Sequence, residues 1–229
     1  MMPRPGLPTM PGPIQRLPLD HRGYPVPYFA AWLDRKGHAM PRKHPDAKPD
    51  FRVTFPGVQE EVLRAGKCWV CGEPLGGHGA FVAGPMCAVN RTSAEPPSHI
   101  ACARWSARAC PFLTLPKAKR RDSGLEDRET PPGVMIRRNP GVALVWIIGF
   151  GARPFTDPHG GLLFHMGTPR KVEWYAEGRR ATREEVEASV TSGLPELEKL
   201  IENDDEEGRA ILAQLLQVAE ALYPEPVSA

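Results

Sequence analysis

Four residues near the middle of the chain have the types and the spacing of a metal site. Cys68 and Cys71 are separated by two residues, and Gly72 after them lets the backbone curl so that both sulfurs face one ion. The second pair, His99 and Cys102, has a spacing of three, which puts both side chains on the same face of a helix. We call these four ligands the CCHC group, and they predict one bound Zn²⁺ as cofactor.

Four protein ligands complete the tetrahedral coordination of zinc and leave no position for a substrate water, so the CCHC group predicts a structural ion. An alternative stays open in which Cys87 or Cys110 replaces His99 and gives an all-thiolate site. Otherwise both cysteines are expected to be small apolar core residues. A redox pair should open a helix after a strand in a βαβ unit, which is not the pattern here, and a chain without metal is the last alternative.

The segment between the two ligand pairs should position them as in a treble clef. A hairpin is expected with its turn at 76–79 and its return through 80–82. Two prolines then precede Ser98, which can cap a helix whose first turn carries the second ligand pair. The positive end of that helix favours thiolates. A knuckle, a hairpin and a helix in this order predict a treble-clef-like module.

The whole chain predicts an α+β fold, in which this zinc module packs with a short antiparallel sheet and a C-terminal helical segment. The 27 prolines and 22 glycines among 229 residues indicate many turns and few long elements. Strands are expected at 24–33 and 51–55, a helix at 57–66 and an antiparallel meander over 134–166. Four parts are expected: a proline-rich disordered arm (1–20), N-terminal strands with the zinc module (21–116), a linker or mobile loop (117–133), and the meander followed by acidic C-terminal helices (134–229).

The C-terminal segment predicts several helices. Thr168 and the proline after it would cap a helix over 171–177. Thr182 and Glu185 form a capping-box pair, which should open a helix that ends near Gly193. Further helical stretches are expected at 195–202 and 206–223. The last of them should pack through one apolar stripe, formed by Ile211, Leu215, Val218 and Leu222.

Charge is distributed unevenly along the chain, although its net value is only +2. Residues 173–229 contain 14 acidic and 5 basic residues, and residues 1–172 contain the other 13 acidic and 24 basic ones. A basic body can contact the phosphates of DNA or RNA without sequence choice, with the acidic tail screening it. The other interpretation is that the tail is simply a solvated helical hairpin, which is the more common role of a charge run. The candidate contact residues lie on and after the zinc helix: Arg104, Arg108, Lys117, Lys119, Arg120, Arg121, Arg137 and Arg138. An adaptor that binds a host or phage protein complex is the alternative.

The sequence identifies no catalytic residue. A His-Me-finger nuclease would need an Asp-His or His-His step on the hairpin to bind its metal. The hairpin offers only His78, flanked by glycines, with Asn90 further on, and the step at Asp20 and His21 precedes the knuckle. The nuclease is therefore the less favoured alternative, and enzymatic activity stays an open question in which a binding role is favoured.

Several runs of the sequence resemble a family of uncharacterised proteins from bacteriophages and high-GC bacteria. They are CWVCGEPLG, GPMCAVNR and EPPSHIACARWSARACPFL, and the resemblance extends from about residue 22 to 194, with a longer insert at 36–48. It implies zinc binding and a phage or mobile-element context. It implies no activity, because the family has none established.

No run approaches the ~20 apolar residues that span a bilayer, so no membrane contact is expected. Prolines interrupt the N-terminal segment, which predicts no signal peptide. Five cysteines are an odd number for a disulfide scaffold, so reduced cysteines in a cytoplasm, bacterial or phage-infected, are expected.

Overall fold

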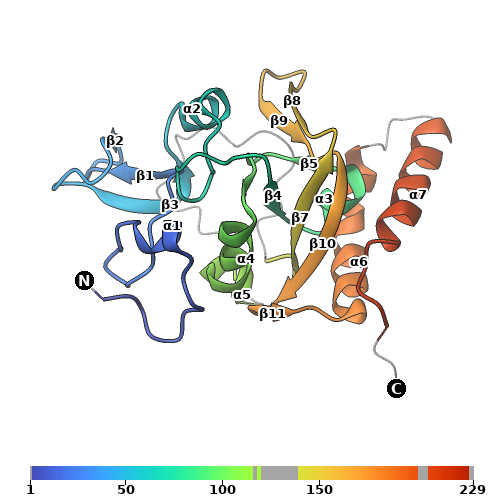
Figure 1. Ribbon diagram of the computed structural model, residues 1–229. Helices are drawn as coiled ribbons and strands as arrows, with labels where there is room; N and C mark the ends of the chain where they lie inside the picture. Colours follow the sequence, from blue (N-terminus) through green and yellow to red (C-terminus); the bar gives the residue numbers. More distant parts are fainter. Residues whose placement is uncertain (1, 116–117, 120–138, 201–205, 227–229) are drawn as a thin grey trace.

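Figure 1 presents a computed structural model of the protein, which describes residues 2–115, 118–119, 139–200 and 206–226. At its centre lies an antiparallel five-stranded sheet with the strand order β11-β10-β7-β4-β6. Its strands are β4 (Gly79–Ala83), β6 (Ser98–His99), β7 (Ala143–Phe150), β10 (Thr168–Ala176) and β11 (Arg179–Arg180).

Helices cover both faces of this sheet, with α4 on one side and α3, α6 and α7 on the other (Figure 1). Side chains alternate between the two faces along each strand, so that Leu144 and Trp146 of β7 point to the larger core while Val145 and Ile147 face α4. The covering helices are α3 (Met86–Asn90), α4 (Ile100–Ala109), α6 (Arg183–Leu200) and α7 (Glu206–Glu220). The expected α+β class is confirmed.

Helix α4 is the element that joins the sheet to the rest of the molecule, because two of its stripes are buried. Ala103 and Ala107 pack on the sheet, and their small side chains let the helix approach closely. Cys102 and Trp105 belong to a second cluster that lies on the opposite side of the helix. The first turn of α4 is therefore fixed from two directions.

The remaining strands form two small antiparallel sheets. One has the order β2-β1-β3, and the other has the order β5-β9-β8. Their bounds are β1 (Ala30–Leu33), β2 (Ala39–Met40), β3 (Lys48–Thr54), β5 (Thr92–Ser93), β8 (Arg153–Thr156) and β9 (Leu162–His165). Three short helices complete the fold: α1 (Gly12–Gln15), α2 (Val58–Ala65) and α5 (Pro111–Thr114). No helix in the described part of the chain is long and apolar enough to cross a bilayer.

The proline-rich segment at the N-terminus packs on the region of the CCHC group, in contrast to the expected unpacked arm. Ile14 in α1 is 0 % exposed and lies in the same cluster as Cys68, Cys71 and Cys102. Apolar residues 7, 10, 14 and 17 recur every three or four positions, which gives the segment one face to bury. The prolines restrict its backbone but leave that face intact.

Residues 171–177 do not form the expected helix. They belong to β10, which pairs with β7 over most of its length and turns at Glu177 and Gly178 into β11. The side chains of Trp174 and Tyr175 are buried on opposite faces of the sheet, which a strand allows and a one-sided surface helix does not. The proline that suggested a helix start stands instead near the beginning of the strand, where a ladder tolerates it.

The expected meander over 134–166 is also split between two sheets. β7 pairs with β4 and β10, whereas β8 and β9 form a hairpin that continues to β5. Gly151 and Gly167, with φ of +75° and +69°, bend the chain where it leaves and rejoins the central sheet. The predicted strand at 134–136 and nearly all of the predicted linker at 117–133 lie outside the described residues.

Helix α6 begins where the sequence predicts, but it does not end at the predicted residue. The N–H of Thr182 donates to Oε2 of Glu185 at 2.9 Å, and the N–H of Glu185 donates to Oγ1 of Thr182 at 3.3 Å, so the capping box is confirmed. α6 then continues through Gly193 and Pro195 to Leu200. A Cβ at Gly193 would lie 3.0 Å from the sulfur of Met86, so this glycine provides close packing on α3 and not a helix stop.

The predicted packing stripe of α7 is rotated in the structure. Ile211 and Val218 are 50 % and 39 % exposed. The residues that reach the larger core are Leu212, Leu215, Leu216, Ala219 and Leu222. Apolar residues occur on more than one side of this helix, so periodicity alone could not select the face.

Candidate metal centre

The first ligand pair lies on a tight knuckle held by its own backbone. The N–H of Cys68 donates to the carbonyl of Glu73 at 2.7 Å, and the N–H of Gly72 donates back to the carbonyl of Cys68 at 2.8 Å. Gly72 has a φ of +76°, and a Cβ there would lie 2.2 Å from the ring of Tyr28. This position therefore requires glycine for both conformation and space.

The second ligand pair is placed by a strand and a helix. β6 pairs with β4, with Gly79 opposite His99 and Ala80 opposite Ser98. His99 is the residue that precedes α4, and Cys102 lies in the first turn of that helix. Strand pairing thus delivers the imidazole to the point where the thiol of the helix can meet it.

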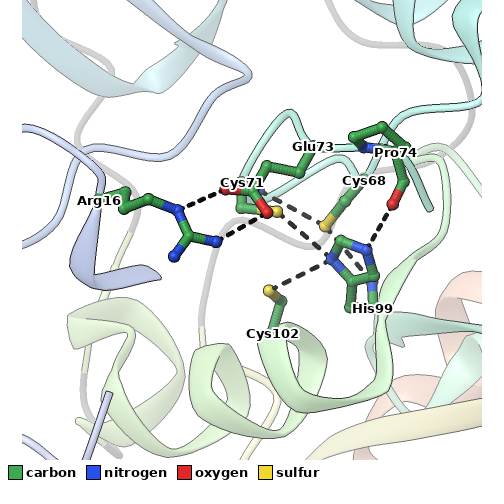
Figure 2. Close-up of polar contacts among 7 residues, drawn as sticks. All are labelled: Arg16, Cys68, Cys71, Glu73, Pro74, His99 and Cys102. Atoms are coloured by element: carbon green, nitrogen blue, oxygen red, sulfur yellow. Dashed lines mark hydrogen bonds and ion pairs between the residues drawn. The ribbon is translucent and has the colours of Figure 1, made fainter. Parts of the chain in front are cut away.

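The four ligand atoms of the CCHC group converge, as Figure 2 shows, and all lie within 4.8 Å of one another. Nδ1 of His99 is 3.4 Å from Sγ of Cys71 and 3.8 Å from Sγ of Cys102. Ligands about 2.0–2.3 Å from a tetrahedral zinc ion are separated by about 3.5–3.8 Å from one another. The spacing of the group therefore fits a single metal ion, and its donor set is one that zinc commonly takes.

The imidazole of His99 is oriented by a hydrogen bond on its far side. Nε2 lies 2.8 Å from the backbone carbonyl of Pro74 (Figure 2). A carbonyl only accepts, so Nε2 carries the proton and Nδ1 presents its lone pair to the thiols. Histidine ligands of metals commonly have such a partner, which fixes both ring and tautomer.

Charge within the CCHC group also favours a cation. Thiol hydrogen bonds from Cys102 and Cys71, followed by backbone N–H groups, lower the pKa of Cys68. For Cys71, the hydrogen bond with Cys102 lowers the pKa, but the neighbouring Cys68 and burial outweigh it and raise the pKa to about 11. Cys68 and Cys71 also raise the pKa of Cys102. One thiolate forms readily, and the other two need a positive ion beside them.

The N-terminal segment closes around the knuckle. Nε and Nη2 of Arg16 donate to the two carboxylate oxygens of Glu73 at 2.7 and 2.9 Å (Figure 2). On the other side, Trp69 of the knuckle stacks on Phe29 with 4.9 Å between the ring centroids. The N–H of Tyr28 donates to Val70 O at 2.8 Å. The knuckle is thus a hub to which both α1 and the β1 region are attached.

Cys87 and Cys110 do not join the CCHC group. Among the described residues, the only cluster of cysteine, histidine and acidic side chains with metal-site geometry contains Cys68, Cys71, His99 and Cys102. Cys87 packs against the larger core, and burial raises its pKa to about 11. Burial also raises the pKa of Cys110. The all-thiolate alternatives are therefore not supported.

The predicted basic residues are only partly described. Arg104 forms a bidentate ion pair with Glu173, and Arg108 and Lys119 are exposed. Lys117, Arg120, Arg121, Arg137 and Arg138 lie outside the described residues. The structure adds two cations that the sequence interpretation missed, Lys171 and Arg180, both within 3.4 Å of Glu173. The expected helix over 171–177 would not place Lys171 beside Glu173, and Arg180 reaches Glu173 through the pairing of β11 with β10.

The residues that a nuclease would need form no metal-binding group of histidine and acidic side chains in the described part of the chain. His78 is exposed in the turn before β4. Oδ1 of Asn90 accepts a hydrogen bond from Thr92 N–H at 2.9 Å, and Asp20 accepts from Tyr24 N–H at 2.9 Å. Asn90 and Asp20 thus have local partners in turns.

No family model, curated protein or solved structure matches this chain. The interpretation of the CCHC group therefore depends on its geometry and chemistry.

Proposed function

We propose that this protein binds one structural Zn²⁺ through the CCHC group and contacts nucleic acid through basic residues near α4. The observation that supports the zinc most directly is the convergence of the four ligand atoms within 4.8 Å. The bound ion would supply the charge that lets three neighbouring thiols act as thiolates, and would join the knuckle to α4. With four protein ligands it would have no open position, so its role is structural.

The finer description of the module is part of the same proposal. A knuckle, the paired β4 and β6, and a helix whose first turn holds the last ligand follow the order of a treble clef. Helix α3 and strand β5 interrupt this order, because they lie between β4 and β6 in the chain, but they add no ligand to the CCHC group. We place the protein in a phage or mobile-element context and in the cytoplasm.

Support for nucleic-acid contact comes from the third, solvent-exposed stripe of α4, which packs neither on the sheet nor on the knuckle. Arg104 and Arg108 lie one turn apart on it, directly after the zinc ligands. A zinc ion that fixes the first turn of α4 would also fix these two side chains. Such cations bind phosphates electrostatically, with steep dependence on salt.

The metal content of the purified protein tests whether the CCHC group binds zinc. We expect about one zinc per chain by elemental analysis, and strong loss of zinc in Cys68→Ser. Cys87→Ser is the matched control, because it removes a partly buried thiol that is not in the CCHC group, and it should keep its zinc. Full zinc and unchanged stability in Cys68→Ser would exclude the site.

Binding of labelled nucleic acid tests the proposed contact with DNA or RNA. Fluorescence anisotropy at low salt should detect binding to duplexes of unrelated sequence with similar affinity. If zinc-loaded protein binds neither DNA nor RNA at low salt, nucleic-acid contact is excluded. A role as a protein-interaction adaptor is then the better proposal for the function.

A further inference from the structure

Glu173 on β10 is a buried carboxylate surrounded by cations. Its side chain is 1 % exposed, and Arg104 donates to both of its oxygens, from Nη2 at 2.7 Å and from Nε at 2.9 Å. Arg180 lies 3.1 Å away and Lys171 3.4 Å away. The hydroxyl of Tyr175 adds a hydrogen bond at 3.0 Å. Three positive charges therefore share one negative charge.

The cations around Glu173 are themselves open to solvent. The side chains of Arg104, Lys171 and Arg180 are 45 %, 62 % and 56 % exposed. Within the part of the chain that the structure describes, Nη1 of Arg104 and both Nε and Nη1 of Arg180 have no hydrogen-bond partner. The carboxylate thus holds the side chains in place, and donors remain for a ligand. Fixing them in advance lowers the entropy cost of binding.

A hollow adjoins this cluster on the surface of α4. It has a volume of about 280 Å³, and Arg104 forms part of its wall together with Arg108. Ala101, Trp105 and the packed N-terminal segment at 9–11 form the rest of the lining. Arg104 therefore belongs both to the hollow and to the Glu173 cluster, which makes one continuous basic face of four cations. We call Arg104, Arg108, Lys171 and Arg180 the α4–β10 face.

We propose that the α4–β10 face is the surface that binds the sugar-phosphate backbone of duplex nucleic acid, with Glu173 as the residue that positions its cations. This inference rests on the proposed nucleic-acid function and assigns it to residues on the central sheet. Phosphates would engage the outward donors of the two arginines and Lys171. The hollow beside Arg104 and Arg108 has room for one phosphate group.

A backbone contact fits this face better than a contact to unpaired bases. Proteins that bind single strands stack bases on exposed aromatic rings. The aromatic residues on this face are buried: Trp105 is 8 % and Tyr175 is 4 % exposed. The indole N–H of Trp105 also donates to the carbonyl of Pro8. The face therefore offers positive charge without a stacking platform, which suits duplex phosphates read without sequence choice.

The test measures how duplex affinity depends on salt, with zinc-loaded full-length protein and fluorescent duplexes of about 20 base pairs, in separate DNA and RNA arms. Each phosphate-contacting cation contributes about 0.9 to the slope of log affinity against log salt, so four contacts give about −3.6. The triple variant Arg108→Ala, Lys171→Ala, Arg180→Ala should flatten this slope by about 2.7 and bind at least tenfold more weakly at low salt. It keeps the ion pair of Arg104 with Glu173.

A matched control removes the same number of exposed cations elsewhere: Arg35→Ala, Arg64→Ala and Arg153→Ala. Its slope should equal that of the parent protein, and its affinity should stay within twofold. Zinc content and thermal unfolding are measured for both triples. If the first triple does not fold, the double variant Arg108→Gln, Lys171→Gln serves in its place and should flatten the slope by about 1.8.

The outcomes separate this inference from the function on which it rests. If the parent protein binds duplexes and the two triples behave alike, the α4–β10 face is excluded while nucleic-acid binding stands. If the parent protein binds no duplex, both are overturned. If polyglutamate competes with the duplex as well as unlabelled duplex does, the face is a site for acidic protein, and the assignment to nucleic acid is wrong.

Discussion

On its sheet side, α4 lies against alanines, valines and isoleucines of a continuous apolar layer, whereas on its knuckle side it meets three thiols and an imidazole. Beyond the sheet lies the larger core, with Trp146 and Phe81 almost completely buried. The N-terminal side has only short strands and small clusters. We conclude that the sheet side is stabilised by apolar burial, whereas the knuckle side would depend on the proposed metal ion for its cohesion.

Removal of the metal should produce the largest difference between the two sides. We expect chelation, or Cys102→Ser, to abolish amide protection over the knuckle and α1, because their contacts converge on the CCHC group. Protection in β7 and β10 should persist. Hydrogen exchange followed by mass spectrometry measures both, with Cys110→Ser as the control. Uniform loss of protection across both sides would contradict the comparison.

The core side should respond most to loss of a large buried ring. Trp146→Ala removes a fully buried side chain whose indole N–H donates to the carbonyl of Met166 at 3.0 Å. The expected loss is about 3–5 kcal/mol in the free energy of unfolding. Denaturant unfolding of the zinc-loaded protein measures it. Zinc stoichiometry should stay at that of the parent protein wherever the variant is folded, and a folded variant without zinc would show that the two sides are not separable.

Acid titration should reveal how much the ionised Glu173 and its cations stabilise the fold. Burial alone would raise the pKa of Glu173, but hydrogen bonds from Arg104, Arg180 and Tyr175 outweigh it and lower the pKa from 4.5 to about 2. The native state therefore binds fewer protons than the unfolded state in this interval. The stabilisation is complete above pH 4.5 and is lost as the pH falls toward 2.

Comparison with Glu173→Gln isolates this contribution, because protonation of the other acidic groups affects both proteins alike. We expect the parent protein to lose on the order of 2 kcal/mol more than the variant between these pH values. Chemical unfolding of both proteins, each prepared without metal, measures the difference at each pH. Parallel pH profiles would mean that Glu173 has the same proton affinity in the folded and unfolded states.

The smallest effect is expected at the start of α6. Thr182→Ala removes the hydroxyl that accepts the N–H of Glu185 and should cost about 1 kcal/mol. Thr191→Ala is the matched control, because this threonine is exposed within the same helix. Thermal unfolding should separate the two variants. Equal stability would indicate that packing on α3 alone fixes the start of the helix.

Features set by neighbouring residues could be predicted from the sequence. The CCHC group, the helix at 58–65 and the capping box of Thr182 and Glu185 depend on spacings of a few positions. Their chemistry is local, because a ligand pair, a cap or a glycine stop acts within one or two turns.

Features set by tertiary partners could not be predicted in this way. Strand β10 contains the charged residues Lys171 and Glu173 beside Val172 and Trp174, a mixture that a surface helix also shows. Arg104 of α4, together with Lys171 and Arg180 of the sheet, explains why a carboxylate is buried there. The packing of Ile14 likewise depends on a knuckle more than fifty residues later in the chain. The periodicity of apolar residues predicts α7 as a helix, but it does not predict which face of the helix reaches the core.

Helix α4 has one stripe on the sheet, one on the knuckle and one that lines the hollow, and this division limits how the protein can change over evolutionary time. Substitutions on its sheet stripe or its knuckle stripe alter packing or metal ligation, so both stripes are under structural constraint. Position 104 is also constrained, because Arg104 pairs with the buried carboxylate of Glu173, whereas the exposed positions 101 and 108 line the hollow and can vary without contacting either interior. A lineage could therefore acquire a different partner by drift at two sites on a single helix, while the fold around it stays unchanged.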